Sequence, residues 1–244
     1  MTVPSFDLSG KRALVVGGRT GIGLTIARAF KGYGAEVMVT GTQHDHDAVQ
    51  SLKAEDIAYF ALDVRDDGAV QMLAANITNL DILVNCAGLV IRDEKGYETA
   101  AFQDTLDVNL TGTMRLCNAF RPHLEKSRGA ILNIASLTTF IGSPKTIGYG
   151  AAKAGIAQLT QSLAIAWAPL GIRVNAIAPG YIRTKINQEM QDKPEFDSYV
   201  SQRTPLGRWG APEEIAGGAV YLCSDAATYV TGTTLAIDGG FLAT

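Results

Sequence analysis

The sequence alternates short apolar runs, rich in β-branched residues, with longer segments of helical pattern, and this alternation restricts the fold more than any other feature. The apolar runs predict strands at 12–16, 36–40, 58–62, 82–85, 130–135, 173–178 and 234–237. Helical patterns lie between them, among others at 22–33, 104–125, 151–168 and 213–224. Almost continuously apolar strands are typical of a sheet covered on both faces, and the alternation implies right-handed crossovers between parallel strands. We therefore predict an α/β fold with a doubly wound parallel sheet of about seven strands and helices on both faces.

Composition and net charge indicate which kinds of binding partner the protein has. The chain has 244 residues, of which 47% are hydrophobic, and a formal net charge of −3. Such a chain can bury a large core, and no basic surface points to nucleic acid or to an anionic membrane. We expect no secretion signal and no membrane span. The sparse cysteines Cys86, Cys117 and Cys223 are interpreted as buried thiols in a reducing compartment, which predicts a cytoplasmic protein.

One segment lacks a regular pattern. Residues 180–210 mix charges, prolines and aromatic residues, and an irregular stretch of that length in a compact domain is usually functional. No linker-like tract or internal repeat divides the chain. We expect a single domain over 1–244, in which residues about 181–210 form a flap over the substrate and carry short helices of their own.

A glycine-rich turn follows the first predicted strand directly. Gly17, Gly21 and Gly23 have the spacing G-x-x-x-G-x-G, and a helical pattern begins within the turn. Glycines here allow a tight turn and a close approach of the backbone to a ligand, while the free amides and the positive dipole end of a helix suit a pyrophosphate. A turn with a purely structural role is the alternative. We predict that the turn binds a dinucleotide, with further contacts from Arg19, Thr20 and Ile22.

The end of the second predicted strand bears on the choice of cofactor. An acidic residue there would bind the ribose 2′-hydroxyl of NAD, but the positions that follow the strand are Gly41 and Thr42. Arg19 in the glycine turn could pair with a 2′-phosphate, which favours NADP(H) over NAD(H). Two observations weigh against this hypothesis: Asp45 and Asp47 follow a few residues later, and Arg19 could be a solvated surface side chain.

A tyrosine and a lysine lie four residues apart near the start of a long helical pattern. Tyr149 and Lys153 would share one helix face, where an ammonium lowers the pKa of a phenol toward the range of an acid–base catalyst. Tyr181 and Lys185 have the same spacing, so the spacing alone does not discriminate. Ser136 ends a predicted strand thirteen residues before Tyr149 and could orient the same substrate oxygen, whereas the corresponding position before Tyr181 is an alanine. Tyr149 is therefore the predicted catalytic tyrosine.

Taken in order, these motifs resemble those of the short-chain dehydrogenase/reductase family over essentially the whole chain. The matches are Gly17-x-x-x-Gly21-x-Gly23, Asp63-Val64, Asn85-Cys86-Ala87-Gly88, Asn109, Ser136, Tyr149-x-x-x-Lys153, Pro179-Gly180 and Ile237-Asp238-Gly239-Gly240. Cys86 departs from the pattern, because asparagine is usual there. The resemblance implies a Rossmann-type NAD(P)-binding domain and an enzyme that transfers hydride between nicotinamide and a secondary alcohol or ketone. It also implies a homotetramer.

The resemblance assigns a role to each motif. Tyr149 would be the general acid–base, Lys153 would lower its pKa and bind the nicotinamide ribose, and Ser136 would polarise the carbonyl. Asn109 would hold a water that relays protons through Lys153, and a packing asparagine at a helix kink is the alternative. The further cofactor contacts would be Asp63 and Val64 at the adenine, Asn85, Ala87 and Gly88 along the cleft, and Pro179, Gly180, Ile182 and Thr184 at the nicotinamide.

The substrate stays open at this point. The pocket is expected between 89–96, 137–147 and the flap, and a sugar acid, a 3-oxoacyl thioester or a simple ketone could fit it. A non-catalytic cofactor-binding protein is the alternative from another class, and lyase or epimerase chemistry is a third. The complete catalytic set argues against the second, and the short chain argues against the third. No metal is expected, since the adjacent residues His44, Asp45, His46 and Asp47 of a polar loop are typically solvated.

Overall fold

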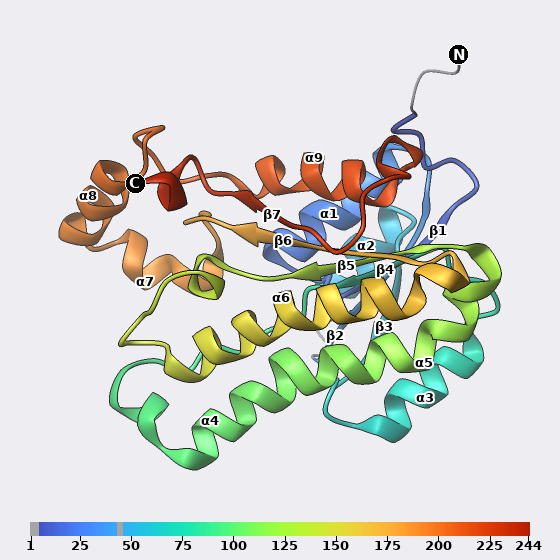
Figure 1. The fold of residues 1–244 in the computed structure, drawn as a ribbon, viewed down its shortest axis with the longest axis horizontal. Coiled ribbons are helices and arrows are strands. Elements are labelled where there is room, and N and C mark those ends of the chain that lie inside the picture. Colours follow the sequence, from blue (N-terminus) through green and yellow to red (C-terminus); the bar gives the residue numbers. More distant parts are fainter. Residues whose placement is uncertain (1–4, 43–45) are drawn as a thin grey trace.

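All seven predicted strands are present, and they form one parallel sheet (Figure 1). The computed structural model describes residues 5–42 and 46–244. Each strand boundary lies within one residue of its predicted position. The strands are β1 (Arg12–Val16), β2 (Glu36–Gly41), β3 (Ala58–Ala61), β4 (Ile82–Asn85), β5 (Ala130–Ile134), β6 (Arg173–Pro179) and β7 (Thr234–Ile237).

The order of the strands confirms the doubly wound sheet. In space the strands run β3-β2-β1-β4-β5-β6-β7, with every neighbouring pair parallel. The chain winds outward from β1 to β3 and then crosses back to place β4 on the other side of β1. The direction of winding therefore reverses between β1 and β4, and in open α/β sheets ligands bind in the crevice that this reversal opens at the carboxyl ends of the strands.

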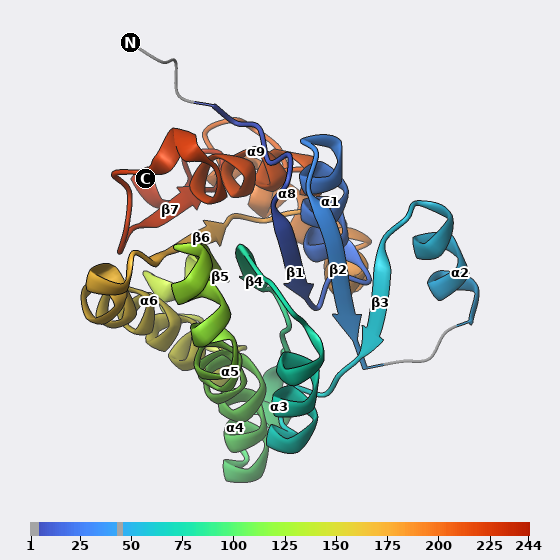
Figure 2. The same ribbon diagram turned by 90° about the vertical axis from the view of Figure 1, so that its right-hand side faces the viewer.

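Helices cover both faces of the sheet, as Figure 2 shows from one end. On one face, α1 (Gly21–Gly32) packs against α9 (Pro212–Cys223), and both contribute to the same apolar cluster, with Phe30 and Ile215 fully buried. On the other face, α3, α5 and α6 share a second cluster that includes Phe120 and Trp167. No helix among the described residues is long and apolar enough to cross a membrane. The α-helices are α1 (Gly21–Gly32), α2 (His46–Ala54), α3 (Asp67–Asn76), α4 (Thr99–Leu106), α5 (Gly112–Ser127), α6 (Ile147–Trp167), α7 (Gln188–Gln191), α8 (Pro194–Arg203) and α9 (Pro212–Cys223).

The helix predicted over 104–125 differs from the observed one in its start and its continuity. Helix α4 already begins at Thr99, and a π-helical turn, Asp107–Thr111, separates it from α5. A π turn accommodates one extra residue without breaking the helix, and such turns are frequent at functional sites. The apolar pattern continues through the turn, which is why periodicity alone merges the three pieces into one helix.

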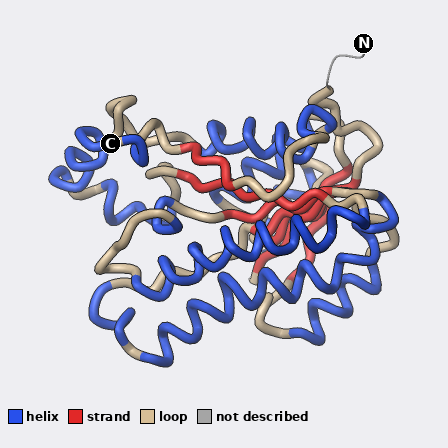
Figure 3. The backbone as a smooth tube through the Cα atoms, viewed as in Figure 1, coloured by secondary structure: helices blue, strands red, loops and turns tan. Residues whose placement is uncertain are grey.

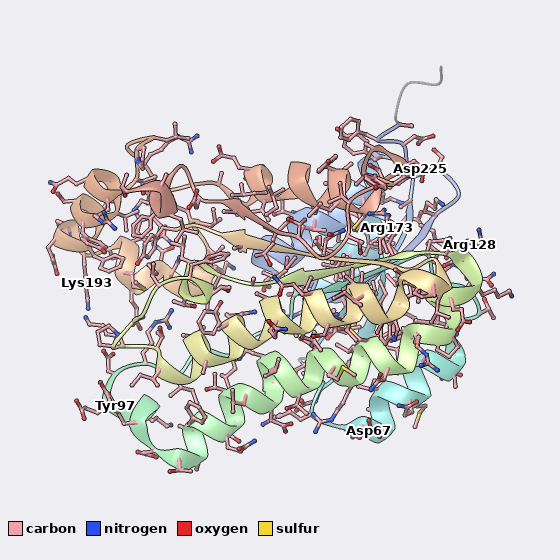
Figure 4. All side chains as sticks on the ribbon, in the orientation of Figure 1. Asp67, Tyr97, Arg128, Arg173, Lys193 and Asp225 are labelled. Carbon is pink, nitrogen blue, oxygen red and sulfur yellow. The ribbon has the colours of Figure 1, made fainter. Side chains whose placement is uncertain are left out.

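The loops that leave the carboxyl ends of the strands gather at one end of the molecule. Arg128 and Arg173, near the beginnings of β5 and β6, are labelled on the right of Figure 4, while Tyr97 and Lys193 are labelled on the left. The same end of the tube in Figure 3 carries α7, α8 and the long loop before α6. A site at the switch point would therefore face these loops.

The irregular segment 181–210 folds back on itself, and we call it the flap segment. Its two ends are joined by a parallel bridge between Ile182 and Gly210, in which Arg183 N donates to Gly210 O at 2.9 Å. Between these ends lie a 3-10 turn, Lys185–Asn187, and the helices α7 and α8. Within the segment, the rings of Tyr181, Phe196 and Trp209 pack together with centroids 5.5–6.1 Å apart. The segment thus has its own short helices and its own small apolar base.

Candidate active site

A cleft of about 350 Å³ opens at the carboxyl ends of β1 and β4, at the switch point of the sheet. Its walls come from the glycine turn, the ends of β2 and β3, the loop after β4, helix α6 and the start of the flap segment. The fold therefore brings together most of the residues that the sequence predicts as a site. Those that line the cleft are Gly17, Arg19, Thr20, Gly21, Ile22, Gly41, Thr42, Asp63, Val64, Ala87, Gly88, Tyr149, Lys153 and Thr184.

The glycine turn forms a cradle of backbone at the start of α1. Gly17 has φ +77°, and a Cβ placed on it would lie 2.6 Å from Ala87 N, so the turn and the loop after β4 can approach only because no side chain intervenes. Thr20 is the N-cap of α1, and its side chain makes no capping hydrogen bond. The helix thus presents its positive end to the cleft. This cradle fits the pyrophosphate of a dinucleotide.

Arg19 lies across the end of β2, where the ribose of a dinucleotide is expected. A Cβ on Gly41 would lie 3.3 Å from Arg19 Cβ and 3.3 Å from Tyr59 Oη. Tyr59 of β3 donates its hydroxyl hydrogen to Gly41 O at 2.9 Å. Gly41 therefore leaves the space that the Arg19 side chain occupies. Tyr59 is a residue that sequence reasoning missed, because its approach to Gly41 depends on the β2–β3 register, in which it lies opposite Val39.

Tyr149, Lys153 and Ser136 come from two neighbouring elements. Tyr149 and Lys153 lie in the first two turns of α6, and Lys153 Nζ is 5.4 Å from the centroid of the Tyr149 ring. Ser136 follows β5 and caps the 3-10 turn Leu137–Thr139, where its Oγ accepts a hydrogen bond from Thr138 N at 3.2 Å. Hydrogen bonding by Ser136 also lowers the pKa of Tyr149. The side chains of Tyr149, Ser136 and Lys153 therefore form one cluster.

Burial decides the protonation of this cluster. Desolvation raises the pKa of Tyr149 to about 12, although the Ser136 hydrogen bond lowers it. Desolvation also lowers the pKa of Lys153 to about 8, and its Nζ donates a hydrogen bond to Ile134 O at 2.5 Å. The expectation that Lys153 would bring the Tyr149 pKa down toward neutrality therefore differs from the structure, in which desolvation is the larger effect. Tyr149 holds its proton at neutral pH and can donate it.

Asn109 lies in the π-helical turn and is completely buried. Its Nδ2 donates to Leu89 O and to Thr105 O, both at 2.8 Å, and its Oδ1 accepts from Leu89 N at 3.3 Å. These are the bonds of a residue that ties the helix kink to the loop after β4, which was the alternative interpretation of Asn109. Neither Asn109 nor Ser136 contributes directly to the wall of the cleft.

Asn85 was expected to line the cleft, and the structure corrects this prediction. Its side chain is buried within the sheet, where Nδ2 donates to Asn133 Oδ1 at 2.9 Å and to Cys117 Sγ at 3.4 Å. Because side chains alternate between the faces of a strand, the cleft receives the next residue, Cys86, instead. Pro179, Gly180 and Ile182 likewise lie beside the cleft and not in its wall.

The described residues contain no group of three or more His, Cys, Asp or Glu side chains that could hold a metal ion. The interpretation of residues 44–47 as a solvated loop falls partly outside the structure, since 43–45 are not among the described residues.

The fold and the ordered motifs define the class of protein. A family model described as Enoyl-(Acyl carrier protein) reductase matches residues 16–242. The chain belongs to the short-chain dehydrogenase/reductase family, and it is an NAD(P)-dependent oxidoreductase that acts on alcohol and ketone groups.

The relatives of the chain include dehydrogenases of sugars and sugar acids. It is 40% identical over 246 residues to the 2-dehydro-3-deoxy-D-gluconate 5-dehydrogenase of Bacillus subtilis, covering 98% of this chain and 97% of the relative. It is 38% identical to the galactitol 2-dehydrogenase (L-tagatose-forming) of Cereibacter sphaeroides, covering 97% and 96%. A gluconate 5-dehydrogenase from Burkholderia cenocepacia, solved in complex with NADP and tartrate, superposes with a TM-score of 0.92 at 32% identity over 98% of each chain.

Proposed function

We propose that the protein is an NADP(H)-dependent dehydrogenase of a sugar acid. The observation that carries this proposal is the single cleft in which the glycine cradle and Arg19 meet Tyr149 and Lys153. The sugar-acid dehydrogenases among the relatives support the substrate class. The test is a spectrophotometric screen of gluconate, 2-dehydro-3-deoxygluconate and their keto forms with both cofactors. Turnover of a long-chain 3-oxoacyl thioester but of no sugar acid would replace this substrate class with the acyl thioester alternative.

We assign proton transfer in this reaction to the cluster of Ser136, Tyr149 and Lys153. NADPH, when bound, supplies the hydride for reduction of the ketone. Ser136 hydrogen-bonds the substrate oxygen and orients it, and Tyr149 donates its phenolic proton to that oxygen. Lys153 stabilises the resulting phenolate, because its ammonium lies on the same helix face and within 5.4 Å of the ring. Asn109 holds the π turn and Leu89 in place beside this cluster, and relay of a proton through a bound water is its proposed further role.

The same proposal assigns cofactor contacts along the cleft. Gly17, Gly21 and the α1 start would hold the pyrophosphate, and Asp63 and Val64 would flank the adenine. Ala87 and Gly88 would border the nicotinamide ribose. Thr184 would bind the carboxamide, supported from behind by Ile182, Pro179 and Gly180.

Preference for NADP(H) rests on Arg19 and Gly41. Arg19 Cβ and Cδ lie 3.3 and 3.4 Å from where a Cβ on Gly41 would be, and this proximity supports a contact between the guanidinium and a 2′-phosphate. We expect Arg19→Ala to lower kcat/KM for NADPH at least tenfold and to change kcat/KM for NADH less than twofold. Steady-state kinetics with both cofactors check this. An equal loss with both would contradict a role in phosphate recognition.

Arg92 is the proposed recognition site for the substrate carboxylate. Its side chain is half-buried in the loop after β4. Its positive charge lowers the pKa of Tyr149 through electrostatic attraction to the phenolate form. The neighbouring Asp93 N donates to Lys145 O at 3.1 Å, which ties this loop to the segment that precedes α6. Arg92→Gln is expected to raise KM for a sugar acid about tenfold and to leave KM for an uncharged polyol unchanged. Residues 181–210 would close over the substrate from the other side as a flap.

The assembly and the location of the protein are part of the proposal. We propose a homotetramer, supported by an apolar residue, Ile165, that is 79% exposed on the outer face of α6. A cytoplasmic location is supported by the three free cysteines Cys86, Cys117 and Cys223.

A further inference from the structure

We propose that Asn187 and Gln191 are positioning residues that hold Thr184 ready to bind the carboxamide of the nicotinamide. This inference rests on the proposed cofactor contact of Thr184. Neither residue carries a sequence signal of its own, because both lie in the irregular flap segment. Neither contributes to the wall of the cleft, so each acts through the residue in front of it.

Thr184 occupies the position where the flap segment meets the cleft. It lines the cleft and is the N-cap of the 3-10 turn Lys185–Asn187. A Cβ on Gly21 would lie 3.7 Å from Thr184 Cγ2, so the methyl group of Thr184 faces the glycine turn across the cleft. The direction of its hydroxyl therefore depends on what holds it from the flap side.

Asn187 holds Thr184 through a single side-chain oxygen. Its Oδ1 accepts hydrogen bonds from Thr184 N at 3.0 Å and from Thr184 Oγ1 at 3.2 Å. Its Nδ2 donates to Ile182 O at 2.8 Å. One amide group thus joins the residues on both sides of Arg183 and closes the first turn of the flap segment as a capping box.

Gln191 completes the network one helical turn further on. Its Nε2 donates to Thr184 O at 2.9 Å and to Asn187 Oδ1 at 2.6 Å. The Asn187 oxygen therefore has three donors, which fixes the orientation of the amide group. Both side chains are half-buried, which protects these bonds from competition by water.

This network determines the chemistry that Thr184 offers to a ligand. Its hydroxyl hydrogen is committed to Asn187 Oδ1, so toward any further partner the oxygen can act only as an acceptor. A hydroxyl held in this way accepts a hydrogen bond from an amide N–H, and the carboxamide of nicotinamide provides such a group.

The test compares two ligands, NADPH and 2′,5′-ADP, which contains the phosphorylated adenosine half without the nicotinamide. Dissociation constants are measured by calorimetry on Asn187→Ala, Gln191→Ala and Thr184→Val. Gln188→Ala is the matched control, because Gln188 lies on α7 like Gln191 but is exposed, and its side chain donates to Asp192 Oδ1 at 2.8 Å and not to Thr184 or Asn187. We expect Asn187→Ala and Gln191→Ala to weaken NADPH binding about fivefold to tenfold, and to change 2′,5′-ADP binding less than twofold.

A double variant separates positioning from a direct contact. Thr184→Val combined with Asn187→Ala should bind NADPH no more weakly than Thr184→Val alone, because the second change acts only through the first residue. Additive losses, equal losses for NADPH and 2′,5′-ADP, or the same loss in Gln188→Ala would overturn the inference. If Asn187→Ala does not fold, Asn187→Asp keeps the acceptor but loses the donor to Ile182, and Gln191→Ala tests the network independently. A wild-type protein that binds neither ligand would instead refute the proposed function.

Discussion

Tyr149 is half-buried and Lys153 is buried on one face of α6, and desolvation moves their pKa values in opposite directions. It raises the pKa of Tyr149 to about 12 and lowers the pKa of Lys153 to about 8. Each shift favours the neutral form, as expected when water is excluded. The Lys153 ammonium is therefore less stable in the folded protein than in water, and the fold tolerates it because Ile134 O accepts a hydrogen bond from it.

At the residue scale, the proposed acid–base role predicts the behaviour of Tyr149→Phe. Removal of the hydroxyl takes away the proton donor and leaves the ring that packs in the cleft. We expect kcat to fall by at least a hundredfold, which is the lower range for loss of a general acid, while the dissociation constant for NADPH changes less than threefold. Stopped-flow kinetics and fluorescence titration measure the two quantities. Activity retained in this variant would refute the assignment of Tyr149.

The lowered pKa of Lys153 predicts a pH-dependent stability. The unfolded lysine titrates near 10.5 and the folded one near 8, so between these values the unfolded chain binds the proton that the folded protein has released. Stability from this group therefore rises as the pH rises from about 8 to 10.5. Relative to Lys153→Met, the cofactor-free wild type should gain about 2 kcal/mol in its free energy of unfolding between pH 7 and pH 9.5.

Urea unfolding of both proteins at the two pH values measures this gain. The opposite contribution of Tyr149 becomes large only above pH 10, where more than half of its unfolded form has lost its proton. Lys145→Met, a change of an exposed lysine in the loop before α6, serves as the control and should show no such difference. A constant difference between wild type and Lys153→Met across this range would show that Lys153 is not desolvated.

At the scale of the element, Gly17 in the glycine turn and Gly32 at the end of α1 differ in whether a side chain can replace the glycine hydrogen. Gly17 combines a φ of +77° with a missing Cβ that would collide with Ala87 N, while a Cβ on Gly32, at the end of α1, meets nothing within 4 Å. We expect Gly17→Ala to cost about 2 kcal/mol or more and to weaken NADPH binding, since the turn must open to accommodate a methyl group. Gly32→Ala should be neutral or stabilise by up to about 1 kcal/mol. Thermal unfolding and cofactor titration of this matched pair provide the measurement, and similar behaviour of the two variants would contradict the cradle.

Periodicity predicts the positions of the strands but not the break between α4 and α5. The strands were located to within one residue because each is a local run of apolar residues bounded by turn residues. The periodic pattern over 104–125 does not show the break between α4 and α5, which only the alternative interpretation of Asn109 as a kink residue indicated. At this break the Asn109 side chain bonds to Leu89, twenty positions away in the sequence. A contact over that distance leaves no periodic trace in the helix itself.

At the scale of the whole molecule, the exposed apolar surface of α6 predicts the assembly. Ile165 is 79% exposed, and its neighbour Ala166 is exposed too, on a helix whose opposite face is buried in the core. We expect Ile165→Arg to convert the proposed tetramer to a smaller species, because a buried charge without a partner opposes association. Light scattering after gel filtration measures the mass. Met72→Arg on α3, which changes an apolar residue that is 66% exposed, is the control and should leave the mass unchanged.

The candidate site combines residues that the sequence identifies with residues that it cannot. Motif order located Tyr149, Lys153, Ser136 and the glycine turn, because each depends on spacing within one or two adjacent elements. Asn85 was misplaced, since its motif does not reveal which face of β4 its side chain takes. Tyr59 and Asn187 were missed, because they meet the site only through strand pairing and through the closure of the flap segment.

The sequence by itself determined the parallel sheet, its helices and the class of chemistry, because alternation, glycine spacing and the Tyr149–Lys153 pair are local properties of the chain. The tertiary structure decided how far these residues are shielded from water and which residues they contact. It withdrew Tyr149 and Lys153 from water, so that desolvation raises the pKa of the tyrosine and lowers that of the lysine, and it placed Arg19 beside Gly41. It also folded the flap segment so that Asn187 and Gln191 form hydrogen bonds with Thr184. Electrostatic and hydrogen-bond energies depend on distance and on the exclusion of water, and both are set only when remote segments meet.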